Sequence, residues 1–349
     1  MPPKLRAEAH FNRGWVTGDD GQALVDFNAA IALEPGFGWA HLGRGHALRN
    51  LRRYDEALAA LTTATRLLPD EALAWYRRGE VLLDMKRPAD ALHDFERLTA
   101  VAPKWSTAWN WRGMAETILG HNDRALTSFD HSLRLQPTNA GSLSLRATIH
   151  AERGNWRAAW ADADASVRME PTEPTHRLTR GRIAMLSGDN AQAIDDMRNA
   201  IPSLDDPTRR VFGAIWMSMA VLRSGRQIEF APVILNFVAK DKDTWPAPVA
   251  WAYLATLGKA NPRWNFGSVE DHLARAQQAA KDLRSGSPEN RACEYGHLLG
   301  TYYVLTGDPA RGRELLSQAA RQRLFSWCYT GARAELARLD QPSAQGKSR

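Results

Sequence analysis

The sequence predicts an all-α solenoid, built from pairs of antiparallel helices stacked along the chain. A proline series, an alanine series and the lack of β-strand alternation predict this fold. Prolines recur every 34 residues, at Pro35, Pro69, Pro103, Pro137 and Pro171. Alanines recur with the same period, at Ala23, Ala57, Ala91, Ala125, Ala159 and Ala193. No segment shows the two-residue alternation of a β-strand, so each 34-residue unit is expected to be helical.

Each 34-residue repeat carries further residues that predict a helix–turn–helix. One place in the first helix is small, so that the second helix can approach: Gly45, Gly79, Gly113 and Gly181, with Ala147 substituting once and Phe11 in the first unit. A second glycine series should end the first helix in a left-handed conformation: Gly18, Gly120, Gly154 and Gly188. Large apolar residues should fill the seam between units: Phe27, Leu61, Phe95, Phe129 and Met197. The prolines should end the second helix, because proline cannot continue its hydrogen-bond ladder.

This pattern resembles the tetratricopeptide repeat (TPR), whose 34-residue consensus carries W…LG…Y…A…F…A…P. Six copies are in register, over 4–37, 38–71, 72–105, 106–139, 140–173 and 174–207. The resemblance implies a right-handed superhelix of paired antiparallel helices. The sixth copy departs from it, because Ile201-Pro202 breaks the register of the terminal proline.

The rest of the chain, 208–340, is expected to hold degenerate repeats. Gly225 predicts the turn of a seventh repeat over about 211–245, and a helix, an irregular stretch and a helix near 268–284 should follow. The pattern returns over 293–320, and a last helix over 326–339 should cover the exposed apolar end. The ending LLGTYYVLTGDPARGRELL, with a later ARAELARL, is similar to the C-terminal repeats of bacterial TPR adaptors. The polar tail, 341–349, is expected to be disordered.

Composition excludes several classes of protein. The net charge of +6 is spread without a dense Lys/Arg block, which disfavours nucleic-acid binding. No apolar run approaches the ~20 residues of a membrane span, and the N-terminus lacks the apolar region of a signal peptide. We therefore expect a cytoplasmic protein if the chain is complete, or a periplasmic one if a leader was removed. Cys293 and Cys328 lack a CxxC spacing and are expected to pack as small apolar residues, without a zinc site or a disulfide framework.

Catalysis is not expected, and neither is a metal or a cofactor. The ten histidines are scattered and show no HExxH spacing, and the sequence has no GxSxG, phosphate loop or GxGxxG after a strand. The abundant acidic residues match solvated helix faces. The sequence therefore predicts a protein that is not an enzyme.

Five arginines stand where the TPR consensus usually has leucine: Arg44, Arg78, Arg112, Arg146 and Arg180. One interpretation is a stripe that binds an acidic peptide or a polyanion. A second series has the same period on the second helix: Asp26, Asp94, Asp162 and Asp196. Because the arginine fork suits bidentate pairing with a carboxylate, we favour structural Arg–Asp pairs between helices.

The resemblance implies that the first helix of each repeat lines a concave groove for a protein segment. The expected lining residues are Trp39, Leu42, His46, Arg49, Tyr76, Asn110, Met114, Ser144, Thr148, Leu178, Arg182 and Met185. The fifth repeat has only small residues at these places, so the groove should be deepest at this waist. The convex face remains an alternative, as does the C-terminal part with Trp245, Trp251 and Trp264. The carboxylate clamp of some TPR proteins is not expected, because Glu8 has the wrong charge although Asn12 fits.

These features predict a non-catalytic scaffold or adaptor that binds a segment of one or more partner proteins. A dedicated accessory subunit or assembly chaperone of one enzyme or machine is the alternative. A binder of acidic polymer or nucleic acid is less favoured by the dispersed charge.

Overall fold

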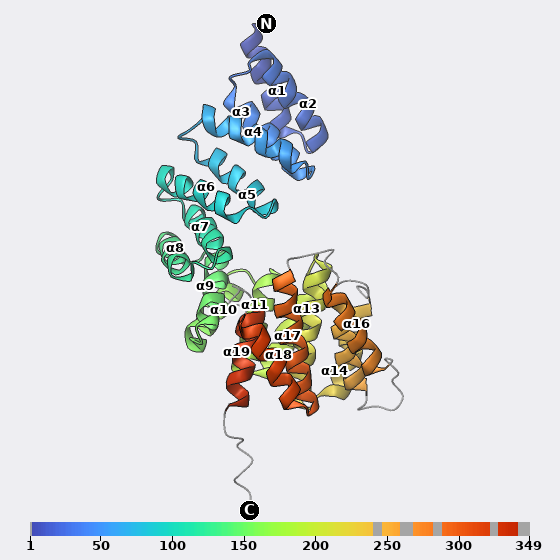
Figure 1. The fold of residues 1–349 in the computed structure, drawn as a ribbon. Coiled ribbons are helices and arrows are strands. Elements are labelled where there is room, and N and C mark those ends of the chain that lie inside the picture. The colour runs from blue at the N-terminus through green and yellow to red at the C-terminus, as the bar shows by residue number, and fades with distance from the viewer. Residues whose placement is uncertain (1, 240–245, 259–267, 282–287, 322–326, 341–349) are drawn as a thin grey trace, which may run out of the picture. The chain divides into compact units, whose positions relative to one another are not determined.

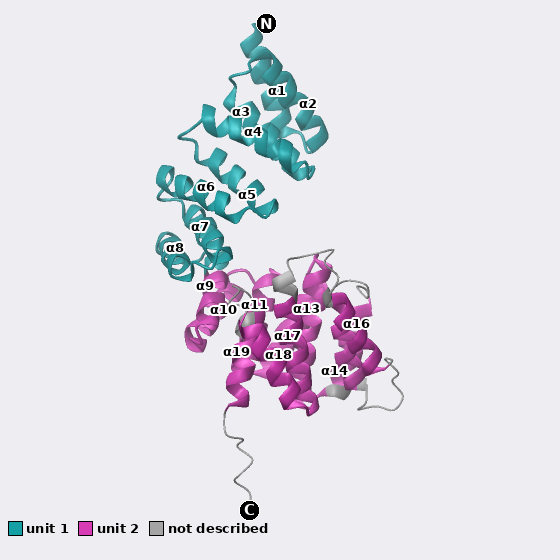
Figure 2. Ribbon diagram, in the orientation of Figure 1, with its two compact units in different colours: residues 1–142 teal, residues 143–349 magenta. Residues whose placement is uncertain are grey.

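The computed structural model describes residues 2–239, 246–258, 268–281, 288–321 and 327–340. Over these ranges the chain is helical throughout, with α1 to α19 and one short 3₁₀ helix, and it contains no strand (Figure 1). The all-α solenoid fold class is confirmed. The chain forms two compact units, residues 1–142 (unit 1) and residues 143–349 (unit 2), which are described separately (Figure 2).

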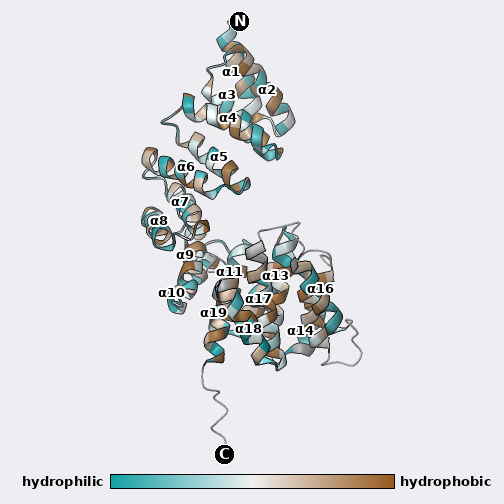
Figure 3. Cartoon of the chain, viewed as in Figure 1, coloured by the Kyte–Doolittle hydropathy of each residue, from teal (hydrophilic) through white to brown (hydrophobic). Residues whose placement is uncertain are grey.

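Unit 1 is a row of antiparallel helix pairs, each packed on the next. Its helices are α1 (Pro3–Val16), α2 (Asp20–Leu33), α3 (Gly38–Asn50), α4 (Tyr54–Leu67), α5 (Ala72–Asp84), α6 (Pro88–Val101), α7 (Ser106–Ile118) and α8 (Asn122–Leu135). Two helices lie in each of the first four predicted repeats. Figure 3 shows hydrophobic and hydrophilic residues alternating along these helices, as expected where one side of each helix packs and the other meets water.

Close approach within each pair depends on the predicted glycines. A Cβ atom on Gly79 would lie 2.4 Å from the ring of Phe95, and one on Gly45 would lie 2.4 Å from Leu61. Neither contact is sterically possible, so the second helix could not sit at this distance from a larger residue. Phe27 fills the seam between repeats, since its ring lies against both Gly14 of its own repeat and Gly43 of the next.

The turn between the paired helices has a left-handed residue, as predicted for Gly120, Gly154 and Gly188. Arg52 and Lys86 occupy the same place in repeats two and three and are also left-handed, at φ 59° and 60°. The repeat geometry therefore imposes this conformation even on residues that disfavour it. The prediction for Gly18 was wrong, because α1 ends in an extended Thr17 and Asp19 caps α2 through the Gln22 amide.

Unit 2 has a thicker core. Its helices are α9 (Ala140–Glu152), which contains the unit boundary, α10 (Trp156–Met169), α11 (Pro174–Ser187), α12 (Asn190–Ala200), α13 (Pro207–Ser224), α14 (Gln227–Ala239), α15 (Ala247–Gly258), α16 (Val269–Lys281), α17 (Pro288–Thr306), α18 (Pro309–Arg321) and α19 (Trp327–Leu339). Ile201–Ser203 forms the 3₁₀ helix, where the sixth repeat loses its proline register. Every residue of α13 from Val211 to Val221 is buried, because α13 packs against α12, α14, α15 and α17.

The last helix closes onto the start of unit 2 through buried charges. The Arg338 guanidinium donates to the carbonyl of Met185 at 2.9 Å and also to that of Leu186, at the end of α11. The buried Glu335 carboxylate contacts both Arg338 and Arg223 of α13. Arginine at a helix C-terminus satisfies carbonyls that lack partners within the helix. These contacts thus connect α11 and α19, two helices that lie far apart in sequence.

The cysteine prediction was wrong in one respect. Cys293 of α17 and Cys328 of α19 form a disulfide, with Cα atoms 5.8 Å apart. Both are buried among Leu316, Ala319 and Ala332, so they also pack as small apolar residues. The sequence separation of 35 residues gives no disulfide motif, and only the antiparallel packing of the last helices brings the two thiols together.

Candidate partner-binding face

Seven of the predicted lining residues belong to unit 1. They occupy the second, fifth, ninth and twelfth places of the first helices, and the three- and four-residue steps keep them on one side of each helix. Leu42 is fully buried and packs with Ala64 and Ala74, so it belongs to the core. The other six are half-buried and form the set we call the docking face: Trp39, His46, Arg49, Tyr76, Asn110 and Met114.

A charge network holds the middle of the docking face. Arg49 donates to Asp84 at 2.7 Å and to Glu80 at 3.0 Å, which ties α3 to α5. Glu80, only 5 % exposed, also accepts from the Tyr76 hydroxyl at 3.2 Å and from Arg77 at 2.8 Å. A buried carboxylate is stabilised when several donors surround it. Arg49 and Tyr76 are therefore fixed in place, which lowers the conformational entropy that binding a partner would cost.

Aromatic rings flank this network. The Tyr76 ring lies edge-on to Trp105, which precedes α7, and to Trp111 of α7, with ring centroids 5.5 and 5.6 Å away. His46 lies 6.2 Å from Trp15, which is 40 % exposed. Burial lowers the pKa of His46, and the Arg77 charge lowers it further. The imidazole is therefore neutral at pH 7, and this part of the docking face combines aromatic surface with fixed polar groups.

Asn110 lies at the end of the docking face in unit 1. Its side-chain amide donates to the Ser142 hydroxyl at 2.8 Å, and Ser142 in turn donates to Ser132 at 2.8 Å. This chain of hydrogen bonds orients the amide. Asparagine carries both donors and acceptors, so an oriented amide can bind a peptide backbone.

The five predicted lining residues of unit 2 lie in a different environment. Ser144, Leu178 and Met185 are buried, and Met185 is only 1 % exposed. Arg182 donates to Thr148 at 3.2 Å and lies over the Trp216 ring, 5.7 Å from its centroid. Burial lowers the pKa of Arg182, while the charge of Glu152 raises it. Because Arg182 donates to Thr148, the space beside this small side chain is filled by Arg182, a residue of the same unit.

The waist predicted at repeat five draws its lining from both compact units, so it stays a prediction. The alternative patch in the C-terminal part is described only at Trp251, which is half-buried and stacks on His272 at 5.9 Å. Trp245 and Trp264 lie outside the described residues. The C-terminal alternative therefore also stays a prediction.

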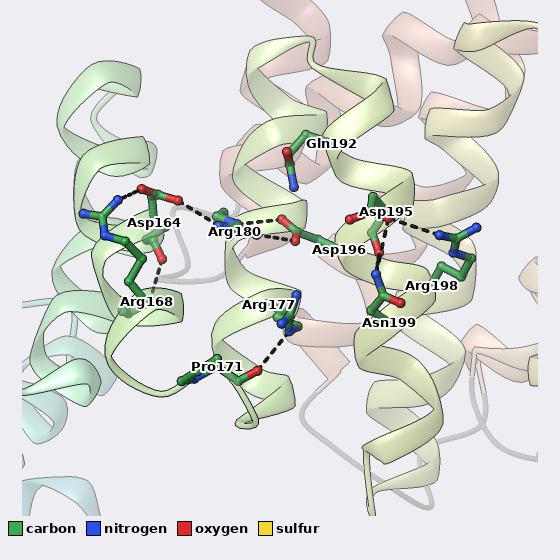
Figure 4. Close-up of polar contacts among 12 residues, drawn as sticks. Asp164, Arg168, Pro171, Arg177, Arg180, Gln192, Asp195, Asp196, Arg198 and Asn199 are labelled. Atoms are coloured by element: carbon green, nitrogen blue, oxygen red, sulfur yellow. Dashed lines mark hydrogen bonds and ion pairs between the residues drawn. The ribbon is translucent and has the colours of Figure 1, made fainter.

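Three arginines of the series form the predicted structural pairs. Arg78 binds Asp94 through two hydrogen bonds of 2.8 and 2.6 Å. Equivalent bidentate pairs join Arg146 to Asp162 and Arg180 to Asp196. Figure 4 shows Arg180 between Asp196 of its own repeat and Asp164 of the preceding one, which it contacts at 2.7 Å. Each of these aspartates is mostly buried, so the hydrogen bonds from arginine replace those to water that the carboxylate loses on folding.

The other places of the series depart from the rule. The first repeat has no arginine at this place, and Asp26 binds Arg13 and His10 instead. In repeat four, Ser128 replaces the aspartate. Arg112 there contacts Glu116 of its own helix at 3.1 Å, and Ser128 donates to the same carboxylate at 2.7 Å. Repeat two has Ala60 in place of the aspartate, and Arg44 has no ion pair within the described part of the chain.

A repeated hydrogen bond between repeats was missed from the sequence. The fourth residue of the first helix donates to the carbonyl of the proline six residues earlier: His41 to Pro35, Trp75 to Pro69, Trp109 to Pro103 and Arg177 to Pro171. The signal was present, because each of these side chains carries a ring or guanidinium N–H at the 34-residue period. Repeat five has Leu143 at this place, which has no N–H to donate.

No group of three or more His, Cys, Asp or Glu residues in the described ranges could hold a metal ion. Among the helices that the structure describes, none is long and apolar enough to cross a membrane.

Comparisons with known proteins agree with the repeat. A family model described as tetratricopeptide repeat matches residues 42–91, 79–140 and 145–206. No curated protein sequence matches the chain. Among solved structures, a TPR protein of Parabacteroides merdae superposes with a TM-score of 0.57 at 17% identity, covering 72% of this chain and 99% of that one. The pilF protein of Pseudomonas aeruginosa superposes with a TM-score of 0.50 at 17% identity, covering 56% and 91%.

At such low identity these likenesses show the fold alone. The repeat series, the paired helices and the matching family model agree with one another, and residues 42–140 and 145–206 form tetratricopeptide repeats.

Proposed function

We propose that this protein is a non-catalytic scaffold or adaptor that docks a segment of a partner protein on the docking face of unit 1. One observation carries the proposal. The docking face keeps aromatic, methionine and arginine side chains half-exposed, while internal hydrogen bonds hold its polar groups in position. Aromatic residues, methionine and arginine are enriched at protein interfaces, and fixed side chains reduce the entropy that association costs.

Affinity purification from the native host, followed by mass spectrometry, tests the proposal. Met114→Arg places a long charge on the docking face, and a partner seated there should be lost. Leu135→Arg makes the same change at the end of α8, where Leu135 is 42 % exposed, and should retain the partner. Circular dichroism on both variants ensures that the comparison is between folded proteins.

Retention of the same partner by a folded Met114→Arg variant would contradict docking on this face. The stoichiometry separates a general adaptor from a dedicated subunit. Several weak partners support an adaptor, whereas one equimolar partner supports an accessory subunit or assembly chaperone. Retention on heparin that is lost steeply with salt would instead support the acidic-polymer class.

A further inference from the structure

Within the described residues, one member of the arginine series, Arg44 of α3, has no carboxylate partner. In repeats three, five and six the arginine at this place holds an aspartate of the paired helix. In repeat four the aspartate is absent, but Glu116 supplies the acid from one turn along the same helix. In repeat two both of these positions are apolar and buried, Ala60 on α4 and Leu48 on α3. The place of Asp164, which Arg180 contacts in the preceding repeat, corresponds to the exposed Asn28.

The surroundings of Arg44 are positively charged. The side chain is half-buried, and Arg66 at the end of α4 is exposed and also lacks an ion pair in the described ranges. The pKa of His41 is lowered first by burial and then by the charges of Arg44 and Arg66, so these cations lie close enough to interact. The exposed Glu56 is bound by Arg53 through two hydrogen bonds of 2.7 and 2.8 Å, which are the main cause that lowers its pKa, and the Arg44 charge is the smallest cause.

Arg44 also lies away from the docking face. An α-helix turns by about 100° per residue, so Arg44 projects roughly opposite to Leu42 and His46 of the same helix. A ligand at Arg44 would therefore occupy a separate surface of repeat two. Failure of the docking proposal would leave the argument about Arg44 unchanged, and the reverse is also true.

We propose that Arg44 is a vacant carboxylate-binding site, which takes an aspartate or glutamate side chain of a partner protein. The partner would supply the acid that α4 lacks, in the bidentate geometry that Arg78, Arg146 and Arg180 show within the chain. An arginine fork matches a carboxylate through two parallel hydrogen bonds, and Arg66 adds attraction for the same negative charge. Arg44 differs from the other four arginines of the series because no acid of the described ranges forms an ion pair with it.

The test uses the full chain and two fluorescein-labelled peptides. One peptide carries four glutamates in a glycine–serine background, and the other carries glutamines in their place. Arg44→Gln should weaken binding of the glutamate peptide about fivefold, as expected for loss of one partly exposed ion pair. Arg134→Gln is the matched control, because Arg134 is an exposed arginine of α8 without an ion pair in the described residues, and binding should change by less than about twofold.

Ala60→Asp is the second variant, since it installs the aspartate of the other repeats. It should fill the site from within, raise the melting temperature by about 3 °C and weaken the glutamate peptide as strongly as Arg44→Gln does. If this variant fails to fold, Arg44→Gln still decides the question.

Several results would overturn the proposal. These are absence of binding by the wild type, equal binding of both peptides, or an unchanged affinity for the glutamate peptide in Arg44→Gln. Displacement of the peptide by acetate at the same carboxylate concentration would overturn the assignment to a protein side chain.

Discussion

The same helical repeat has two different inner faces in the two units. In unit 1 the six docking-face residues of α3, α5 and α7 remain half-exposed around the Arg49–Glu80 network, although Leu42 and Glu80 are buried. In unit 2 the corresponding places of α11 and α13 hold Leu178, Met185, Phe212 and Trp216, all of which are buried. The repeat residues fix how paired helices pack, but they do not decide whether the inner face stays open.

The cause of the difference lies in the chain that follows. Unit 1 contains only paired helices that contact their neighbours. In unit 2, α15 and α17 return to α13 and contribute Tyr253, Leu298 and Tyr302 to one continuous core. The helix α19 reaches α11 and α13 through Arg338 and Glu335. Burying these apolar side chains favours the closed arrangement. Unit 2 is therefore stabilised by burying an inner helix surface that stays half-exposed in unit 1.

The largest expected effects come from core truncations that compare the two units. Phe95→Ala in unit 1 and Ile215→Ala in unit 2 remove fully buried side chains, which should cost about 4 and about 3 kcal/mol of local stability. Since solenoid repeats depend on their nearest neighbours, faster hydrogen exchange should stay within α5–α8 for Phe95→Ala. For Ile215→Ala it should spread from α11 to α17. Exchange confined to α13 and α14 in that variant would contradict the continuous core.

The disulfide gives the next largest effect. Cys328→Ser opens a loop of 35 residues, so the free energy of unfolding of unit 2 should fall by about 3 kcal/mol. Urea unfolding, followed by hydrogen exchange in each unit, measures this loss, and unit 1 should not change. The reduced wild type is the control and should match the variant. Equal stability of the oxidised and reduced proteins would contradict a stabilising cross-link.

The next prediction compares an arginine that forms a buried ion pair with an exposed arginine. Arg78→Ala leaves Asp94 buried without its partner and should lower the stability of unit 1 by about 2 kcal/mol. Arg134→Ala removes an exposed arginine without an ion pair in the described residues, and the melting temperature should stay within about 1 °C. Thermal unfolding of both variants measures the difference. Equal melting temperatures would show that the Arg–Asp pairs do not hold the helices together.

The smallest expected effect is at acid pH. The hydrogen bond from Arg13 is the largest cause that lowers the pKa of Asp26 from 3.8 to about 2, while burial opposes it. A depressed folded-state pKa contributes stability above the unfolded value, and this contribution is lost as pH falls through about 2. Asp26→Asn should therefore flatten the fall in stability of unit 1 below roughly pH 4. An unchanged acid limb in urea titrations would contradict the assignment.

The sequence predicted local packing well, because that packing repeats. Gly79 against Phe95 and Arg78 against Asp94 both follow from places 16 residues apart within one repeat. The prediction failed for Gly18, because the extended Thr17 after α1 takes the place of a left-handed turn residue. It also missed the His41-to-Pro35 hydrogen bond, since the donor changes residue type from repeat to repeat.

The candidate site could be predicted only in part. The resemblance to TPR proteins predicted that Tyr76, Asn110 and Arg49 lie on the inner side of their helices. It could not show that Leu42 packs fully into the core, because the exposure of an inner residue depends on the neighbouring repeats. The same limit applies to Met185, which is buried and whose backbone carbonyl accepts from Arg338, a residue distant in sequence.

By itself, the sequence determined the helix pairs, their period and the charges that join them, because these depend on residues within about one repeat of each other. Only the tertiary structure decided which inner face is filled, that Cys293 meets Cys328, and that Arg44 forms no ion pair in the part of the chain that the structure describes. These outcomes depend on helices distant in sequence, or on side chains that must be absent from every neighbouring helix. A 34-residue period constrains neither.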